Sequence, residues 1–389
     1  MNKYLNFLST QAGRALGNLP FFLSTLIPKR KNMLLFGSWF GNTYSDNPRY
    51  IYEHSLNKPE LYVFWITKNK DTYNLMKQLG LPVATAMSLK GIWLQFRAGA
   101  IVFTHSPATE FYSCLVAKRT RRIQAWHGAP LKKIGHDDLF STKNNSRALI
   151  SSIIFPHRFD KYDLIFATGT PDKKIFERAF NVKQENVVIT GYPRNDILHS
   201  DKRKISLAPP KSILYLPTFR GAPGSEFKLL DSPMFNHKKI NKILNLHNCH
   251  LKIKLHPVQK LSQKAEEELS TCTNISLISD NLDTHTELKR YDALITDYSS
   301  IFFDYILTYK PTYMLPIDIE DYLTKDRAIY YNYPDVCPSE PQKNWESLLN
   351  YIFEVEYPVN QHLSTITKFH SYADANASER AIKEIVKIL

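Results

Sequence analysis

The sequence predicts an α/β protein with two Rossmann-like, parallel-sheet domains, and two features of its pattern carry this prediction. Short apolar runs alternate with amphipathic stretches of helix length from residue 33 onward, which is typical of βαβ units. The alternation stops in a polar, basic stretch that ends in Pro209-Pro210 and then starts again, as expected for a linker. A chain of 389 residues is also long for a single domain.

The apolar runs mark the expected strands in order. In the first domain they are 33–38, 62–67, 99–105, 122–128, 163–169 and 186–193, with 88–99 as one connecting helix. In the second domain they are 212–218, 250–257, 274–279, 292–300 and 311–316. A final helix at 373–388 has no strand after it and is free to pack back across the domain junction. We therefore divide the chain into a segment 1–32, domains 33–205 and 206–372, and a C-terminal helix 373–389.

Composition and charge limit the classes of function. Hydrophobic residues make up 43% and charged residues 22%, which excludes disordered, collagen-like and coiled-coil chains. The net charge of +13 indicates an anionic partner: nucleic acid, an acidic membrane or a phosphorylated substrate. The four cysteines contain no CxxC pair, which argues against a zinc site and a disulfide framework and fits a reducing cytosol. Because the Walker A, GxGxxG, HExxH and GxSxG motifs are absent, we expect no cofactor and no metal.

The N-terminal region contains the apolar segment LPFFLSTLI at 19–27, followed by Pro28 and a basic trio at 29–31. This run is shorter than the roughly 18 apolar residues needed to span a bilayer. A signal peptide would place its basic residues before the apolar run, so the order here is wrong for one. Two interpretations stay open, an amphipathic membrane anchor and a helix packed on the first domain.

Ligands of open parallel sheets bind beyond the carboxyl ends of the strands, so polar residues directly after the apolar runs are candidate site residues. His127 follows the run IQAW at the start of a turn, and an imidazole that titrates near neutrality suits a general base. Arg194 follows the last expected strand of the first domain. The alternatives are a histidine that only satisfies a loop carbonyl and an ordinary surface arginine.

In the second domain, two pairs of residues suit a diphosphate. Thr218 and Arg220 come at the end of the strand 212–218, and a planar guanidinium matches phosphate oxygens. Lys254 and His256 alternate along the expected strand 250–257, so both would point to one face at its carboxyl end. We expect this pair to clamp a diphosphate, and solvent-facing cations are the alternative.

The run 296–305, TDYSSIFFDY, is the strongest single feature of the sequence. The strand ends at Asp297, and Ser299 or Ser300 can cap a helix whose free N–H groups would receive a phosphate. Asp304 lies four residues after Ser300, on the same helix face and inside an apolar run. A carboxylate in such surroundings needs a partner, and the alternative to a donor contact is a bond to a neighbouring turn.

Five motifs in order resemble the CDP-glycerol glycerophosphotransferase family, the teichoic acid primases and polymerases. They are WHGAPLKKIGHD at 126–137, GYPRND at 191–196, LPTFRG at 216–221, KLHP at 254–257 and TDYSSIFFDY at 296–305. The segment GSWFGNTYSDNPRYIYE at 37–53 is similar to the N-terminal region of that family. The resemblance therefore extends over most of the chain.

The resemblance implies a GT-B architecture, with two Rossmann-like domains facing a central cleft. It implies an enzyme that transfers glycerol phosphate from CDP-glycerol to a polyprenyl-diphosphate-linked or glycerol-phosphate acceptor and releases CMP, in teichoic acid or capsule-type polymer synthesis. The length is closer to primase-like members. The family also implies a peripheral protein on the cytoplasmic face of the bacterial membrane, with an anionic membrane surface and no nucleic acid as partner.

The same resemblance assigns roles to individual residues. His127 matches the catalytic base, and we take His256 as a second catalytic histidine. The donor-binding positions are Gly128, Ala129, Pro130, Leu131, Arg194, Pro217, Thr218, Arg220, Lys254, Leu255, His256, Ser299, Ser300 and Asp304. The family motif usually has Thr where this chain has Ala129, which removes a hydroxyl group near the base.

Three alternatives remain beside this prediction. The nearest is a transferase of CDP-ribitol or another CDP-polyol on the same fold, because the motifs for the diphosphate would look the same. A basic nucleic-acid-binding protein would need aromatic residues interleaved with cations on one exposed face, whereas most aromatics here fall in core patterns. A catalytically inactive, membrane-bound scaffold is the third.

Overall fold

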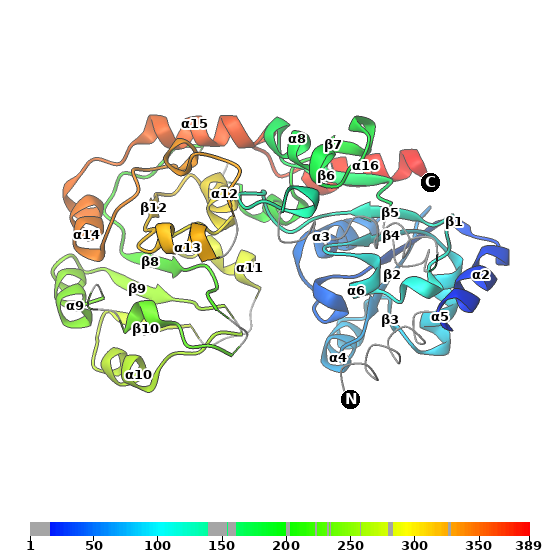
Figure 1. The fold of residues 1–389 in the computed structure, drawn as a ribbon, viewed down its shortest axis with the longest axis horizontal. Helices are drawn as coiled ribbons and strands as arrows, with labels where there is room; N and C mark the ends of the chain where they lie inside the picture. Colours follow the sequence, from blue (N-terminus) through cyan, green and yellow to red (C-terminus); the bar gives the residue numbers. More distant parts are fainter. Residues whose placement is uncertain are drawn as a thin grey trace. The chain divides into compact units, whose positions relative to one another are not determined.

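The computed structural model describes residues 16–138, 154, 161–199, 203–221, 224–231, 233, 235–256, 258–278, 283–325 and 328–389. The chain forms two structural units, each built on one parallel sheet (Figure 1). Unit 1 contains the chain up to His127, Gly135–Asp196 and Asp374–Leu389. Unit 2 contains Gly128–Ile134 and Ile197–Ala373.

The two units are discontinuous in the sequence, whereas the division expected from the sequence was into consecutive segments. The main transition follows Asp196 rather than residue 205, because Leu198 and Ile205 already pack in the core of unit 2. The segment Gly128–Ile134 belongs to unit 2, where the Leu131 carbonyl accepts a hydrogen bond from the Tyr330 amide at 2.9 Å. The C-terminal helix α16 (Ala377–Ile388) belongs to unit 1.

Unit 1 has a seven-stranded parallel sheet with the strand order β3-β2-β1-β4-β5-β6-β7. Its strands are β1 (Arg30–Phe36), β2 (Tyr62–Thr67), β3 (Val83–Thr85), β4 (Ala98–Phe103), β5 (Arg121–Gln124), β6 (Leu164–Ala167) and β7 (Val187–Ile189). Every strand that the sequence predicts for this domain is present. Strand β3 was not predicted, because three residues give too short an apolar run to recognise.

The sheet of unit 1 buries one apolar layer on each face. Strand side chains alternate, so Leu34 and Phe36 join one cluster whereas Met33 and Leu35 join another. The first layer is covered by residues of α3 (Asp46–Ser55), α4 (Lys70–Gln78) and α16, and the second by α5 (Leu89–Arg97). Two further helices, α6 (Pro107–Glu110) and α8 (Thr170–Ala179), follow β4 and β6.

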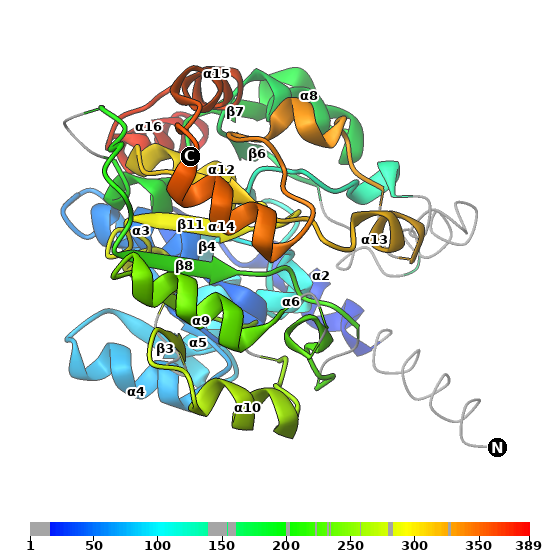
Figure 2. The same ribbon diagram turned by 90° about the vertical axis from the view of Figure 1, so that its left-hand side faces the viewer.

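Unit 2 has a five-stranded parallel sheet with the order β10-β9-β8-β11-β12. Its strands are β8 (Ser212–Leu216), β9 (His250–Ile253), β10 (Ile275–Leu277), β11 (Ala293–Thr296) and β12 (Thr312–Met314), each within a predicted run. The helices are α9 (His237–Leu246), α10 (Gln263–Ser270), α11 (Thr284–Leu288), α12 (Ile301–Tyr305), α13 (Ile319–Lys325), α14 (Trp345–Glu354) and α15 (Val359–Phe369). Figure 2 shows α9 and α10 on the same side of this sheet.

Both sheets reverse their strand order at one point, which fixes where ligand-binding residues can gather. In unit 1 the reversal lies between β1 and β4, and in unit 2 it lies between β8 and β11. The chain leaves the two strands at such a point in opposite directions, so the loops after them separate at the carboxyl edge of the sheet. In open parallel sheets this is where ligands bind.

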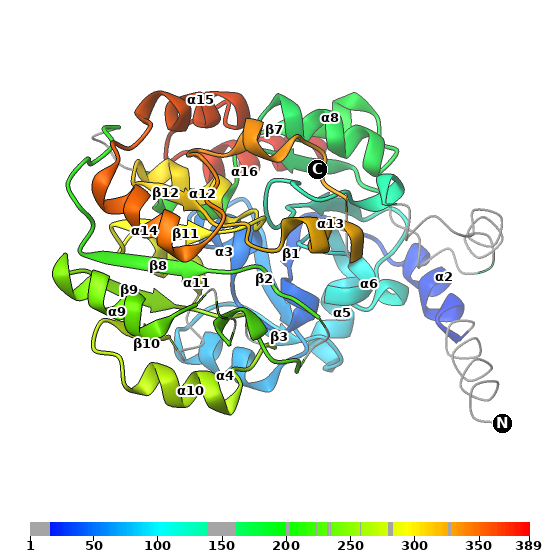
Figure 3. The same ribbon diagram turned by 60° about the vertical axis from the view of Figure 1, so that its left-hand side comes forward.

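Helix α2 (Asn18–Leu26) lies at the edge of unit 1 (Figure 3), where it contacts the short 3-10 turn Ser113–Leu115. Phe21 and Ser24 are buried, whereas Leu19, Leu23 and Leu26 are 67%, 49% and 78% exposed. Spacings of three and four residues place these leucines on one face of the helix. The segment therefore packs on unit 1 through one face and presents an apolar surface on another. No helix among the described residues is long and apolar enough to cross a membrane.

Candidate functional site

His127 lies just beyond the carboxyl end of β5, where the sequence predicts it, and the neighbouring strand β4 sets the orientation of its ring. Its Nδ1 is 3.1 Å from the carbonyl oxygen of Thr104, the residue after β4. Because a carbonyl only accepts, Nδ1 carries the proton and donates it, which leaves Nε2 with a free lone pair. Trp126 stacks on the ring at a centroid distance of 4.4 Å. His127 thus has the tautomer that a base acting through Nε2 requires.

The surroundings of His127 keep its ring neutral at pH 7. The pKa of His127 is lowered to about 4, mainly by burial and also by the neighbouring His105 ring, against opposing contributions from Asp46 and the Thr104 carbonyl. A neutral imidazole can accept a proton, so the site satisfies the first requirement of general-base catalysis.

Arg194 enters this site from the loop after β7 and forms a buried ion pair with Asp46. The Nη1 and Oδ1 atoms are 3.0 Å apart, and the side chains are 3% and 4% exposed. The other carboxylate oxygen of Asp46 accepts a hydrogen bond from Trp39 Nε1 at 2.9 Å. Asn47 accepts from the Arg194 amide at 3.1 Å and donates to the Trp126 carbonyl at 3.1 Å. The loops after β1, β5 and β7 are thereby joined around His127.

The backbone around this site is strained. Trp39, Phe40, Asp46 and Trp126 have φ angles of 44°, 63°, 63° and 55°, in the left-handed region that side chains with a Cβ rarely adopt. Each such residue costs about 1–3 kcal/mol, and this kind of strain persists where the surrounding contacts require it, often at functional sites.

Sequence reasoning missed two residues of this site, His105 and Glu110. His105 follows Thr104 after β4, and its ring stacks on His127 at 4.4 Å with an interplanar angle of 12°. Glu110, at the end of α6, is fully buried and accepts hydrogen bonds from the amides of Thr104 and His105 at 3.2 Å and 3.0 Å. His105 sits at a strand end just as His127 does, so the criterion that selected His127 would have found it.

In unit 2, Thr218 and Arg220 are held together with Asp297 at the carboxyl ends of β8 and β11. The Thr218 amide donates to both Asp297 oxygens at 3.0 Å. Arg220 contacts Asp297 at 2.7 Å and pairs with Asp318 through Nε at 2.6 Å and Nη2 at 2.7 Å. Burial alone would raise the pKa of Asp318, but its bonds with Arg220 bring it below the usual value. The Arg220 charge is therefore balanced by two carboxylates, whereas the sequence predicted it to face a phosphate. Pro217 is buried in the same turn.

The expectation that Lys254 and His256 alternate along a strand is wrong, because β9 ends at Ile253 and both residues lie in the following loop. Lys254 is 8% exposed, and its amide donates to the Tyr215 carbonyl at 3.0 Å. His256 is exposed, and its ring lies 5.3 Å from that of Phe219. The partial desolvation of this ring by its surroundings lowers the pKa of His256. Leu255 between them packs against the core of unit 2. Both residues still follow a strand next to β8.

Ser299 and Ser300 precede α12 as predicted, but the cap is weaker than expected. Ser300 occupies the N-cap position without a side-chain cap bond, and the Ile301 amide is 3.5 Å from Ser299 Oγ. Asp304 is fully buried, and its Oδ2 lies 3.2 Å from His285 Nε2. The sequence predicted that the buried Asp304 carboxylate needs a partner, and His285 of α11 is one such partner.

The residues after His127 are placed in unit 2. Gly128 has a φ of 141°, where a side chain would be strained, and Ala129 and Leu131 are 3% and 1% exposed in the core of that unit. Pro130 is buried as well. Lys132, which sequence reasoning missed, lies over the Tyr298 and Tyr322 rings at 5.7 Å and 4.7 Å.

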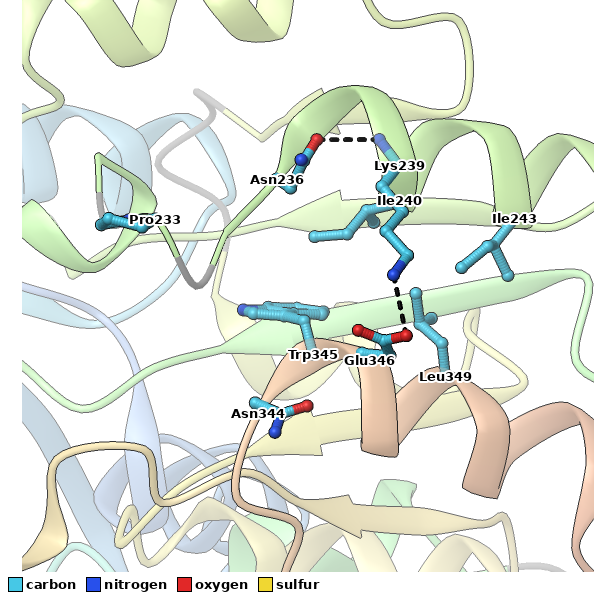
Figure 4. Close-up of a pocket in the computed structure, with 9 residues that line it drawn as sticks. All are labelled: Pro233, Asn236, Lys239, Ile240, Ile243, Asn344, Trp345, Glu346 and Leu349. Carbon is cyan, nitrogen blue, oxygen red and sulfur yellow. Dashed lines mark hydrogen bonds and ion pairs between the residues drawn. The ribbon is translucent and has the colours of Figure 1, made fainter.

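A pocket of about 250 Å³ lies between α9 and α14 (Figure 4). Its lining contains none of the predicted site residues, and Lys239 and Glu346 pair at 2.8 Å beside it. In the part of the chain that the structure describes, no group of three or more His, Cys, Asp or Glu residues could hold a metal ion. The absence of a metal or cofactor in the reaction stays a prediction.

Comparison with known proteins identifies the family of this chain. Residues 19–387 match the family described as CDP-Glycerol:Poly(glycerophosphate) glycerophosphotransferase. The chain belongs to this family. It is 28% identical over 385 residues to a teichoic acid glycerol-phosphate transferase of Staphylococcus aureus (strain NCTC 8325 / PS 47), covering 94% of this chain and 96% of that protein. It is 25% identical over 402 residues to a teichoic acid poly(ribitol-phosphate) polymerase of Bacillus spizizenii, covering 99% of this chain and 60% of the polymerase.

Among solved structures, the fold is similar to that of the wall teichoic acid polymerase TagF. The TM-score is 0.73 at 22% identity, covering 100% of this chain and 98% of that chain. That polymerase has also been soaked with CDPG. The predictions of the family, of two parallel-sheet α/β domains and of a CDP-glycerol glycerophosphotransferase are confirmed.

Proposed function

We propose that this transferase moves glycerol phosphate from CDP-glycerol to a hydroxyl group of a membrane-linked glycan or polyol-phosphate acceptor, with His127 as the base. The observation that carries the role of His127 is its hydrogen bond to the Thr104 carbonyl at 3.1 Å, which leaves Nε2 free to accept a proton. Family membership supports CDP-glycerol as the donor. Similarity over 98% of the length of a teichoic acid glycerol-phosphate primase of Bacillus subtilis (strain 168) supports a primase-like reaction.

The chemistry requires one proton acceptor and a way to neutralise a diphosphate. The acceptor hydroxyl gives its proton to His127 Nε2, and its oxygen attacks the β-phosphorus of CDP-glycerol, the phosphorus that carries the glycerol. The bond from that phosphorus to the bridging oxygen breaks, and CMP leaves with that oxygen. Such transfers depend mainly on positioning and on charge stabilisation. Negative charge from the bound donor would also raise the pKa of His127 towards the range in which a base is most effective.

We assign the donor diphosphate to unit 2, at the carboxyl ends of β9, β8 and β11. Lys254 and His256 follow β9, and Ser299 with Ser300 follow β11, so these groups share one edge of the sheet. Because Asp297 and Asp318 balance the charge of Arg220, we assign Arg220 to holding the 217–221 turn in shape. The backbone amides at Ser299 and Ser300, together with Lys254 and His256, are then the groups that contact phosphate oxygens.

The decisive experiment measures CMP release from CDP-glycerol by chromatography, with a lipid-linked or soluble acceptor analogue. We expect release that depends on the acceptor and falls by about 100-fold or more in His127→Ala, because a general base contributes factors of that order. His250→Ala, an exposed histidine at the start of β9, is the matched control and should retain full activity. Equal release by the parent protein and His127→Ala would contradict the assignment of the base.

The second candidate is transfer of ribitol phosphate from CDP-ribitol, and the similarity to a poly(ribitol-phosphate) polymerase supports testing it. Turnover with CDP-ribitol but not CDP-glycerol would keep His127 as the base and change the donor. Products of one unit or of many, separated by gel electrophoresis, distinguish priming from polymerising. The pathway, teichoic acid or a capsule-type polymer, follows from the acceptor that supports turnover.

We also place the protein on the cytoplasmic face of the bacterial membrane as a peripheral protein. The support is the exposed leucine face of α2 followed by the basic residues 29–31, since apolar area with adjacent basic charge is what binding to an anionic lipid surface requires. A membrane-linked acceptor would then be delivered at the surface where the enzyme is bound.

A further inference from the structure

The site around His127 contains a second histidine whose environment is as well defined as that of the base. His105 and His127 are both anchored on Thr104, the first residue after β4. His127 Nδ1 donates to the Thr104 carbonyl, and His105 Nδ1 lies 2.9 Å from Thr104 Oγ1. The two rings stack in nearly parallel planes. One residue at the strand end therefore fixes the relative position of two imidazoles.

The proton of His105 can be placed from its partners. The Thr104 hydroxyl is in short contact with Glu110 Oε1, and since a carboxylate only accepts, this hydroxyl donates its proton to Glu110. The Thr104 oxygen can then only accept from His105, whose Nδ1 is also 3.3 Å from Glu110 Oε1. Nδ1 of His105 accordingly carries a proton shared between these two acceptors. As in His127, Nε2 is the nitrogen that is left free.

Glu110 is the residue of this arrangement whose burial costs the most free energy. Its carboxylate is fully buried, and a buried carboxylate is tolerated only when hydrogen-bond donors replace its water. The donors are the Thr104 amide and hydroxyl, the His105 amide and the His105 ring. The Glu110 carboxylate therefore caps the turn after β4. It also places a negative charge behind the His105 ring, which stacks on His127.

We propose that His105, held by Glu110, is a positioning residue for the base: its stacked ring fixes the orientation of His127, and the buried carboxylate compensates the positive charge that His127 acquires when it takes the acceptor proton. The proposal rests on the role of His127 proposed above. The charged groups that act on the His127 ring are Asp46 and Arg194, whereas Glu110 contacts the His105 ring and Lys68 lies near Glu110. Asp46 and Arg194 form an ion pair with each other, so Glu110, bonded to the His105 ring, supplies the negative charge that acts on the two rings through His105.

The first test needs no substrate and therefore does not depend on the proposed reaction. In the full-length protein, an NMR titration of the histidine Cε1–H signals reports the pKa of His127, and nuclear Overhauser contacts report the stacking of the two rings. In His105→Phe, which keeps a ring but cannot take up a proton, we expect the pKa of His127 to rise above about 4, because the His105 ring lowers it. An unchanged pKa, or no contact between the rings in the parent protein, would overturn the proposal.

The second test separates positioning from folding through the kinetics. We expect His105→Asn, which keeps an N–H donor but has no ring, to lower kcat by up to about 100-fold with little change in KM. His105→Phe should retain more of kcat, with the acidic limb of its pH–rate profile moved to higher pH. Glu110→Gln should also lower kcat and leave KM. His247→Asn removes another stacked histidine, 3.9 Å from Phe353, and should change neither parameter. Identical kcat values and pH profiles for His105→Asn, His105→Phe and the parent would refute the positioning role, whether or not CDP-glycerol proves to be the donor.

Discussion

Arg194 and Asp46 show how a single pair of residues holds the site in shape. Both side chains are almost fully buried, and Asp46 also receives the Trp39 indole N–H. A buried pair of this kind adds little net stability, but the loss of one partner leaves the other charge uncompensated. The pair therefore joins the loop after β7 to the loop after β1 beside His127.

We expect Arg194→Ala to lower the free energy of unfolding by about 3–5 kcal/mol, because it leaves the Asp46 carboxylate buried without its counter-charge. Urea unfolding followed by circular dichroism measures the change. Arg178→Ala is the matched control, since Arg178 pairs with Asp137 at 2.8 Å but is 63% exposed, and such pairs contribute about 0–1 kcal/mol. Similar losses in the two variants would show that burial of the Arg194 pair has no special importance.

At the scale of elements, two helices illustrate different uses of an amphipathic pattern. Helix α16 buries its apolar face: Ala381, Ile382 and Ile385 are buried in unit 1, and the Asp196 carboxylate accepts from the Ala377 and Ser378 amides at 2.8 Å each. Helix α2 buries Phe21 and leaves its leucines exposed. Helix α16 therefore completes a core, whereas α2 leaves an apolar face exposed among the described residues.

If the exposed face of α2 binds a membrane, replacing the leucines should weaken binding without unfolding the protein. We expect the double variant Leu23→Glu with Leu26→Glu to bind anionic phospholipid vesicles at least about 10-fold more weakly, because each buried leucine contributes about 1.5–3 kcal/mol. Vesicle co-sedimentation measures the change. Leu246→Glu, at an equally exposed leucine at the end of α9, is the control and should bind like the parent. Unchanged vesicle binding by the double variant would remove α2 from the membrane contact.

For the whole molecule, buried neutral histidines link stability to pH. Burial lowers the pKa of His362 to about 4, while the unfolded chain keeps the ordinary value near 6.5. His362 is fully buried, with Nε2 3.1 Å from the Ile306 carbonyl and Nδ1 2.8 Å from the Tyr357 hydroxyl. His127 and His370 have lowered pKa values for the same first reason, burial.

Between pH 4 and 6.5 the unfolded chain binds more protons than the folded one, so stability falls as the pH is lowered through this window. We expect a loss on the order of 3 kcal/mol from His362 alone by pH 4. Urea midpoints at pH 7, 5.5 and 4.5 measure the dependence. His362→Gln, whose amide can still bond Ile306 and Tyr357, should show a shallower decline than the parent. Parallel declines in both proteins would place the acid sensitivity elsewhere.

The amino-acid sequence by itself determined the two parallel sheets, most of their strands, and the positions of His127, Thr218 and Ser299 at strand ends. Alternating apolar runs encode these features locally, because strand and helix periods are properties of neighbouring residues. Only the tertiary structure decided which side chains the site residues contact. It placed Arg194 against Asp46, Arg220 between Asp297 and Asp318, Asp304 against His285, and His105 against His127. These contacts join residues from different strands, and their geometry depends on strand order and loop conformation, which periodicity does not contain.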